Sequence, residues 1–189
     1  MRERTVYVIY WDNYGQDAYL YGSGVTFLGD GSVLFENERM PSGYSIKKWS
    51  SQTSFLRDKC EPSLPLLQEG VRYMVRPCMQ VSPPGTVLLR VEFFNRQRER
   101  ISFLFLEGED PCFEVPEGTW YYCLELVQSG SKKLHFYGIL LCQDHAALRR
   151  EIAAWRGKAF PEKAAQIGRR RMFWSREEGK RGRTQRGGK

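Results

Sequence analysis

Apolar and polar residues alternate along most of the chain, from Val6 to about Leu141. Between Val87 and Phe93, for example, Val87, Leu89, Val91 and Phe93 occupy every second position and alternate with Arg90 and Glu92. A period of two places one apolar and one polar face on a β-strand. The same pattern predicts strands over residues 25–28, 32–35, 71–81, 87–93, 101–105, 120–126 and 134–141.

Turn sequences separate these strands at short intervals. They are Gly29-Asp30-Gly31, Pro83-Pro84-Gly85, Glu107 to Pro111 and Gln128 to Ser131. Gly and Pro supply the backbone angles that tight turns require. No helical pattern lies between the strands, as the crossovers of a parallel sheet would require. We therefore predict an all-β fold, an antiparallel β-sandwich or jelly-roll. Ile101, Phe103 and Phe105 are expected to continue the apolar face.

The pattern changes after Cys142. Asp144 is a suitable N-cap, and Leu148, Ile152 and Trp155 follow with helical spacing. Residues 179–189 are largely Gly, Lys and Arg, with almost nothing to bury. We predict a β-sandwich domain over 1–142 and a basic C-terminal extension over 143–189. The extension is expected to be helical over about 144–158 and then mostly disordered.

Charge is concentrated in that extension. Residues 1–145 hold 15 basic and 18 acidic residues, a net charge of −3, whereas residues 146–189 hold 14 and 4, a net of +10. Arg169, Arg170 and Arg171 precede Phe173 and Trp174, a mixture that suits an anionic membrane surface. A solubilising tail without a partner is the alternative, and a nucleic-acid contact is the least favoured.

Targeting and cysteine patterns indicate a cytoplasmic protein. The apolar run from Val6 to Trp11 is shorter than the hydrophobic region of a signal peptide, and no run could span a bilayer. The five cysteines are irregularly spaced, so we expect reduced thiols and no zinc site. No cofactor or metal is predicted.

Residues typical of catalysis are sparse. The two histidines, His135 and His145, have no neighbouring nucleophile in the sequence. Ser23 lies between two glycines but lacks the flanking spacing of a nucleophile elbow. We therefore predict no catalytic residues. An enzyme would be reconsidered if the fold placed a histidine beside Ser23 and a carboxylate.

Two Pro-containing segments interrupt the strand pattern, Met40–Trp49 and Pro62–Leu67. Pro fixes its φ angle and Gly43 permits unusual backbone, so both segments suit a rigid docking surface. Alternatively, Ile46, Leu64, Leu66 and Leu67 close the end of the core. Aromatic residues expected where a strand runs out into a loop could stack on sugars or anchor a protein, with burial as the alternative. The candidate contact residues are Trp11, Tyr21, Met40, Pro41, Ser42, Gly43, Trp49, Pro62, Leu64 and Pro65.

An ordered set of short motifs gives a family resemblance. It comprises Tyr21-Gly22-Ser23, Val25-x-Phe27, Phe35-x-Asn37, Met40-Pro41-Ser42-Gly43, Ile46-x-x-Trp49 and the segment from Pro62 to Tyr73, with a later match from Glu125 to Phe136. From about Tyr7 to Leu141 the chain resembles the smallest of the three accessory proteins of the Gram-positive accessory Sec system. Residues 143–189 lie beyond the resemblance.

The resemblance implies a sandwich similar to a carbohydrate-binding module, without catalytic residues. It implies two larger accessory Sec proteins as partners, one similar to a glycosyltransferase and one to a serine hydrolase. It further implies that the protein acts together with the accessory motor ATPase. The cargo would be serine-rich repeat glycoprotein adhesins, with their N-acetylglucosamine-type sugars as a further contact. The expected location is the cytoplasm, peripherally at the cell membrane. The alternative is a free-standing, lectin-like carbohydrate-binding domain.

Overall fold

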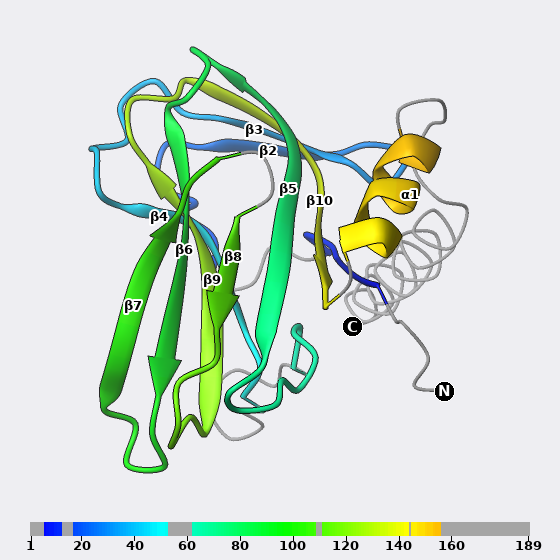
Figure 1. Cartoon of the computed structure of the whole chain (residues 1–189). Helices are drawn as coiled ribbons and strands as arrows, with labels where there is room; N and C mark the ends of the chain where they lie inside the picture. The colour runs from blue at the N-terminus through cyan, green and yellow to red at the C-terminus, as the bar shows by residue number, and fades with distance from the viewer. Residues whose placement is uncertain (1–5, 13–16, 53–61, 109–110, 144, 156–189) are drawn as a thin grey trace, which may run out of the picture.

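The computed structural model describes residues 6–12, 17–52, 62–108, 111–143 and 145–155. Within these ranges the chain forms ten strands and one helix (Figure 1). The elements are β1 Tyr7–Ile9, β2 Gly24–Phe27, β3 Val33–Glu36, β4 Ser45–Ser50, β5 Arg72–Ser82, β6 Val87–Phe94, β7 Arg100–Leu106, β8 Cys112–Glu114, β9 Tyr121–Gln128, β10 Lys133–Cys142 and α1 His145–Trp155.

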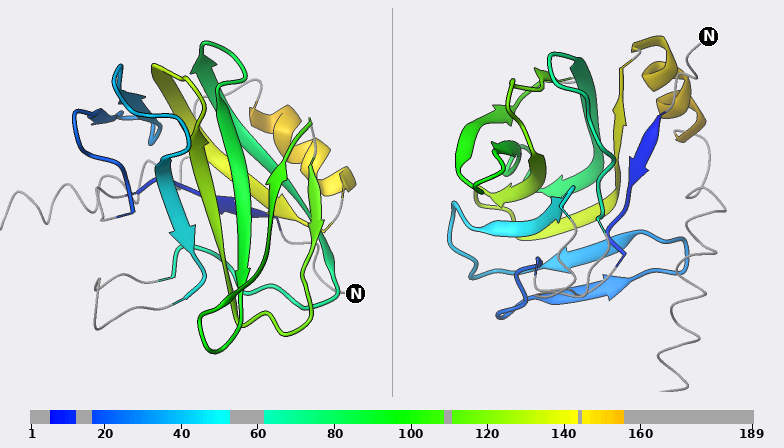
Figure 2. Two further views of the ribbon diagram at one scale, coloured as in Figure 1. Left: turned by 90° about the vertical axis from the view of Figure 1, so that its left-hand side faces the viewer. Right: turned by 90° about the horizontal axis from the view of Figure 1, so that it is seen from below.

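The strands form two antiparallel sheets that face one another (Figure 2). One sheet has the order β2-β3-β10-β5-β8, with β1 added beside the second half of β10, and the other has the order β4-β9-β6-β7. From β3 to β10 the chain changes sheets at every step except between β6 and β7. The first and last strands of this series are neighbours, as in a jelly-roll. The predicted antiparallel sandwich is confirmed.

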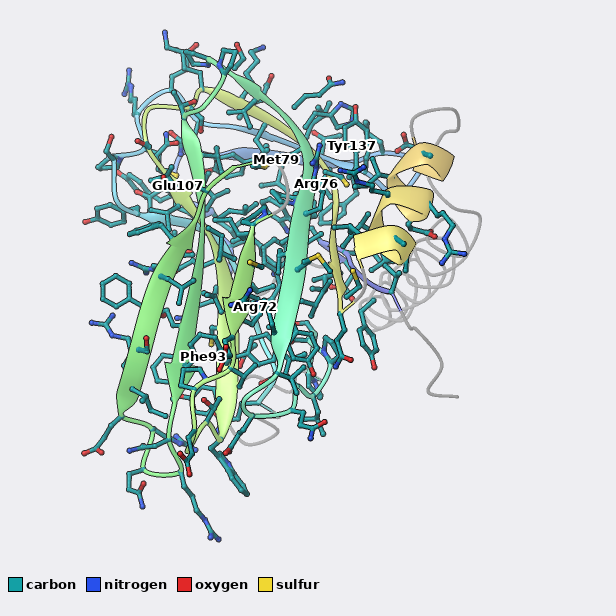
Figure 3. All side chains as sticks on the ribbon, in the orientation of Figure 1. Arg72, Arg76, Met79, Phe93, Glu107 and Tyr137 are labelled. Carbon is teal, nitrogen blue, oxygen red and sulfur yellow. The ribbon has the colours of Figure 1, made fainter. Side chains whose placement is uncertain are left out.

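Alternation along the central strands explains why the two sheets adhere. Val91 and Phe93 on β6, and Leu124 and Leu126 on β9, point inward and are fully buried. Charged or polar residues between them face the other side of the sheet. Burying apolar surface contributes about 25 cal/mol per Å², so this shared core is the main stabilising contribution. Phe93, labelled in Figure 3, belongs to it.

The turn predicted at residues 29–31 is present between β2 and β3. The N–H of Leu28 donates to the carbonyl of Ser32, and Gly31 has a φ of +85°. The carboxylate of Asp30 accepts hydrogen bonds from the N–H and the hydroxyl of Ser32, at 2.9 and 2.7 Å. The turn is therefore closed by both backbone and side-chain bonds.

The expectation that Trp11 and Trp49 extend from loops toward solvent is wrong. Both side chains are almost fully buried, at 2% and 1% exposure. Trp49 lies within β4 and donates its indole N–H to the carbonyl of Tyr10, at 2.8 Å. Trp11 packs on Phe35 and Phe136. An apolar ring whose polar atom finds a partner is most stable inside the core.

Two further expectations are also wrong, namely that Ile101, Phe103 and Phe105 continue the core face and that Trp120 lines one face of its strand with Tyr122. Ile101, Phe103 and Phe105 on β7 point outward and are exposed, because Leu104 and Leu106 fill the core side of this strand. Trp120 precedes β9 and is 60% exposed, whereas the following Tyr122 is buried. On β7 the sequence is apolar on both faces, so alternation alone does not identify the inner one. Trp120 is exposed for another reason, because it lies before the first residue of β9.

Helix α1 packs beside β10 on the side away from the second sheet (Figure 1). Leu148 is fully buried there against Leu140 and Cys142, and Ile152 joins the same cluster with Val8 of β1. Among the described residues, no helix is long and apolar enough to cross a membrane. The predicted membrane contacts Arg169, Arg170, Arg171, Phe173 and Trp174, and the predicted disorder of 179–189, lie outside the described residues.

Candidate functional site

The turn from Met40 to Tyr44 is held rigidly against the end of β9. The N–H of Gly43 donates to the carbonyl of Gln128 at 2.7 Å, and the N–H of Gln128 donates to the carbonyl of Tyr44 at 2.8 Å. Gly43 has a φ of +88°, which favours glycine. Met40 is buried and anchors the turn, while Pro41, Ser42 and Gly43 are exposed.

A second segment lies against this turn. The rings of Tyr19 and Tyr44 meet edge to face with centroids 5.8 Å apart. The side-chain amide of Asn37 donates to the carbonyl of Tyr21 at 3.0 Å and to the hydroxyl of Ser23 at 2.8 Å. These bonds fix a surface that we name the tyrosine tip. It comprises Leu20, Tyr21, Pro41, Ser42, Gly43 and Tyr44, all of them exposed.

The other predicted segment, Pro62–Leu67, is fixed at the opposite end of β4. The N–H of Ser63 donates to the carbonyl of Ser50 at 3.1 Å, and the hydroxyl of Tyr122 donates to the carbonyl of Pro65 at 2.9 Å. Leu64 is buried, so it closes the core as the alternative interpretation proposed. Leu66 does not, because it is 83% exposed.

The two segments therefore do not form one surface. They flank the six-residue strand β4, which spans about 20 Å at the usual rise per residue. Of the ten candidate contact residues, the exposed ones are Tyr21, Pro41, Ser42, Gly43 and Pro62, Pro65 is half-buried, and the buried ones are Trp11, Met40, Trp49 and Leu64. Tyr44 lies within the predicted segment Met40–Trp49 but not among the ten individual candidates, and Leu20, which adjoins Tyr21, was not predicted.

A buried ion pair lies beneath the segment that leads to the tyrosine tip. The ammonium of Lys47 is 2.8 Å from the carboxylate of Asp17, with side-chain exposures of 2% and 34%. The same ammonium lies 5.9 Å from the ring centroid of Trp11 and 6.0 Å from that of Trp49. Both rings present π electrons to a cation that has left water. No motif in the sequence predicts this arrangement.

A serine, a histidine and a carboxylate do come together, but the serine is Ser32. Its hydroxyl donates to Asp30 at 2.7 Å and lies 2.8 Å from Nε2 of His135. With that proton directed at Asp30, Nε2 must be the donor to Ser32, and Nδ1 accepts from the hydroxyl of Tyr137 at 3.1 Å. Ser32 is fully buried. This order of bonds orients the turn and does not activate a nucleophile.

The same hydrogen bonds lower the pKa of the Asp30 carboxyl group. Burial alone would raise the pKa of Asp30, but the side-chain and backbone hydrogen bonds from Ser32 outweigh it. The pKa of Asp30 is therefore held below its ordinary range. An ionised Asp30 keeps the β2–β3 turn attached to β10, so the network is structural.

Known proteins resemble this chain over most of its described part. A family model described as "Accessory Sec secretory system ASP3" matches residues 18–143. The ASP3 protein of the accessory Sec system of Streptococcus gordonii is 34% identical over 119 residues, covering 63% of this chain and 75% of the relative. The ASP3 protein of Staphylococcus aureus is 28% identical over 136 residues, covering 72% of this chain and 42% of the relative.

Two solved structures share the fold. One is a chain of the Glycosylation Associate Protein (Gap123) complex of Streptococcus agalactiae, with a TM-score of 0.67 and 33% identity, covering 72% of this chain and 44% of that chain. The other comes from a structure of accessory secretory proteins 1, 2 and 3 of Streptococcus pneumoniae. It has a TM-score of 0.69 and 28% identity, covering 73% of this chain and 96% of that chain. The chain thus spans less than half of the staphylococcal relative and of the Gap123 chain. Since the family model matches more than half of its residues, this chain belongs to the accessory Sec secretory system ASP3 family.

Proposed function

We propose that this chain is a noncatalytic subunit of an accessory Sec export complex, in which it binds two larger accessory proteins. Membership of the ASP3 family supports this, because relatives come from a Gap123 complex and from a structure of accessory secretory proteins 1, 2 and 3. In this proposal the chain works in the cytoplasm as a scaffold. It supports the export of serine-rich repeat glycoprotein adhesins together with the accessory motor ATPase.

The tyrosine tip is the structural observation that supports a binding role. Tyr21 is 85% exposed and Tyr44 is 54% exposed, so two large aromatic rings meet solvent, and the segment that carries Tyr21 contacts Tyr44 through Tyr19. Their backbone is fixed by the bonds of Asn37 and Gly43, so little conformational entropy would be lost on binding. Exposed tyrosines on a rigid base are common anchors of protein interfaces.

Co-expression with the two larger accessory proteins tests this proposal. The wild-type chain should co-purify with both in one peak of a size-exclusion column. Substituting Tyr21→Ala and Tyr44→Ala together should weaken the complex by about tenfold or more, as expected of interface anchors. Tyr7→Ala is the matched control, because Tyr7 is 40% exposed on β1, beside α1. If the wild type failed to co-purify with either protein, the proposal would be wrong.

A free-standing carbohydrate-binding domain is the second candidate. The exposed Trp120, whose ring lies 5.3 Å from the guanidinium of Arg96, provides a flat apolar surface with a polar group beside it. Such a ring can stack on a sugar. N-acetylglucosamine oligomers should then quench tryptophan fluorescence in the wild type and not in Trp120→Ala. Trp49→Ala is unsuited to this test because Trp49 belongs to the core.

A membrane contact through the basic extension also remains a proposal. The net charge of +10 over residues 146–189 and the aromatic pair at 173 and 174 support it. Flotation with anionic liposomes should recover the full-length chain. A full-length variant with serine at Arg169, Arg170, Arg171, Phe173 and Trp174 should remain at the bottom of the gradient. Equal flotation of both proteins would contradict the proposal, and this design leaves α1 in place on β10.

A further inference from the structure

The outer side of strand β7 carries apolar residues that the core does not use. Ile101, Phe103 and Phe105 are 42%, 48% and 40% exposed, while Leu106 of the same strand is buried. Three large apolar side chains along a single strand exceed the scattered exposure normal for a monomer surface. We name the surface they share with Lys48, Arg90 and Arg100 the β7 face.

This surface lies at the edge of a sheet. Within the described residues β7 pairs with β6 alone, so its other side has no neighbouring strand. In Figure 3, β7 forms the left-hand margin of the molecule, and side chains project from it away from β5 and β10. An exposed apolar edge favours association unless something covers it. Helix α1 lies on the opposite side and does not cover it (Figure 1).

Charges on the β7 face are arranged in two layers. The carboxylate of Glu92 accepts hydrogen bonds from Lys48 and Arg100, each at 3.0 Å, and Glu125 accepts from Nε of Arg90 at 2.9 Å. The side chains of the two carboxylates are only 5% and 6% exposed. Those of the cations are 24% exposed for Arg90, 36% for Lys48 and 50% for Arg100. Solvent therefore meets the cations, which outnumber the carboxylates by three to two.

The cations are also packed on the rings. The guanidinium of Arg100 lies 4.8 Å from the centroid of Phe103, that of Arg90 lies 5.8 Å from Phe105, and the ammonium of Lys48 lies 5.9 Å from Phe94. These contacts restrict long side chains that would otherwise sample many rotamers. The β7 face is thus an ordered mixture of aromatic rings and cations, and aromatic and arginine side chains are enriched at protein interfaces.

We infer that the β7 face docks an acidic surface of one of the two larger accessory proteins. Carboxylates of that protein would reach Arg100 and Lys48, and its apolar side chains would cover Phe103 and Phe105. A second copy placed on the same face would bring cations against cations, so the charge pattern favours a different protein. The inference rests on the proposed function, because it requires the complex to form.

Binding of the full-length chain to each larger accessory protein, measured by biolayer interferometry, tests the inference. Phe103→Ala with Phe105→Ala should raise the Kd at least tenfold. Arg100→Gln should slow association and reduce its dependence on salt, because an exposed cation steers an acidic partner. Lys133→Gln is the matched control, since its side chain is 67% exposed and ion-paired on the other sheet. Circular dichroism should show that each variant is folded.

Each outcome separates the inference from the proposed function. If the wild type binds and the β7 variants bind equally well, the docking inference is wrong and the proposed function stands. If the wild type binds neither protein, the proposed function is wrong and the inference falls with it. If light scattering shows that the isolated chain is a dimer that Phe103→Ala dissociates, the occupant is a second copy, which also overturns the inference.

Discussion

Trp49 stacks on Phe136 across the interior of the sandwich, with ring centroids 5.4 Å apart and an interplanar angle of 27°. Trp49 belongs to β4 and Phe136 to β10, so one aromatic contact joins the two sheets. Phe136 also meets Trp11, which comes from the segment after β1. Three elements far apart in sequence thus share a single aromatic cluster.

Trp49→Ala should therefore destabilise the fold by about 3–5 kcal/mol, the usual range for removing a buried aromatic side chain. The loss comes from the cavity and from the missing hydrogen bond to the carbonyl of Tyr10. Urea unfolding followed by circular dichroism would measure it. Leu66→Ala is the control, and its effect should stay within about 0.5 kcal/mol because that side chain is exposed. Equal effects of the two substitutions would contradict the proposed role of Trp49.

The Lys47–Asp17 pair predicts that the two partners respond differently to neutral substitution. Asp17→Asn removes a carboxylate charge from beside a buried ammonium and should lower the free energy of unfolding by about 1–3 kcal/mol. This loss is smaller than that expected for a fully buried ion pair, because Asp17 is partly exposed. Lys47→Met keeps the apolar stem between the tryptophans and lets Asp17 turn to water, so it should be nearly neutral. Thermal unfolding of both variants would compare them. A larger loss for Lys47→Met would show that the ammonium itself is required.

Acid should weaken the fold through Glu92. Burial alone would raise the pKa of Glu92, but the hydrogen bond and charge of Lys48, followed by Arg100 and Arg90, hold that pKa below its ordinary value of 4.5. A lowered pKa in the folded state stabilises the protein above the ordinary pKa, and this contribution is lost as the pH falls through the folded value. The free energy of unfolding, measured by urea from about pH 7 to about pH 2.5, should decline more steeply for the wild type than for Glu92→Gln. Parallel declines would contradict the shift.

Gly43→Ala should cost about 1–2 kcal/mol, because a residue with a Cβ is strained at a φ of +88°. No atom lies within 4 Å of the added Cβ, so steric contact contributes nothing and the loss reports backbone strain alone. Gly24→Ala is the matched control, since its φ is not in the left-handed region and its nearest neighbours are 4.0 Å away. Differential scanning calorimetry of the two variants would separate them. A stable Gly43→Ala protein would mean that the turn adopts another conformation at little cost.

The pattern of apolar and polar residues was sufficient to predict the strands and the two-sheet fold. It was insufficient to predict which aromatic side chains are exposed. Turn residues such as Gly31, and the alternation of apolar and polar residues along β6 and β9, depend on the local backbone conformation. Strands and hairpins could therefore be predicted from the sequence. The exposure of Trp49 or Phe103 depends on which face of a strand meets the opposite sheet. For Trp49 that choice is made by distant residues such as Phe136, and for Phe103 the strand is apolar on both faces, so its sequence alone does not identify the buried one.

The pairing of β1 with β10 has a consequence for synthesis. Tyr7 lies opposite Leu141, so β1 leaves the ribosome well before its partner β10 and cannot pair until β10 has followed. Until then the apolar side chains of Val6 and Val8, and the facing positions on β10 and α1, cannot meet one another. Long-range closure of this kind is slow. The nascent chain therefore leaves β1 unpaired until β10 and α1 have been synthesised, and its apolar side chains are open to aggregation during that interval.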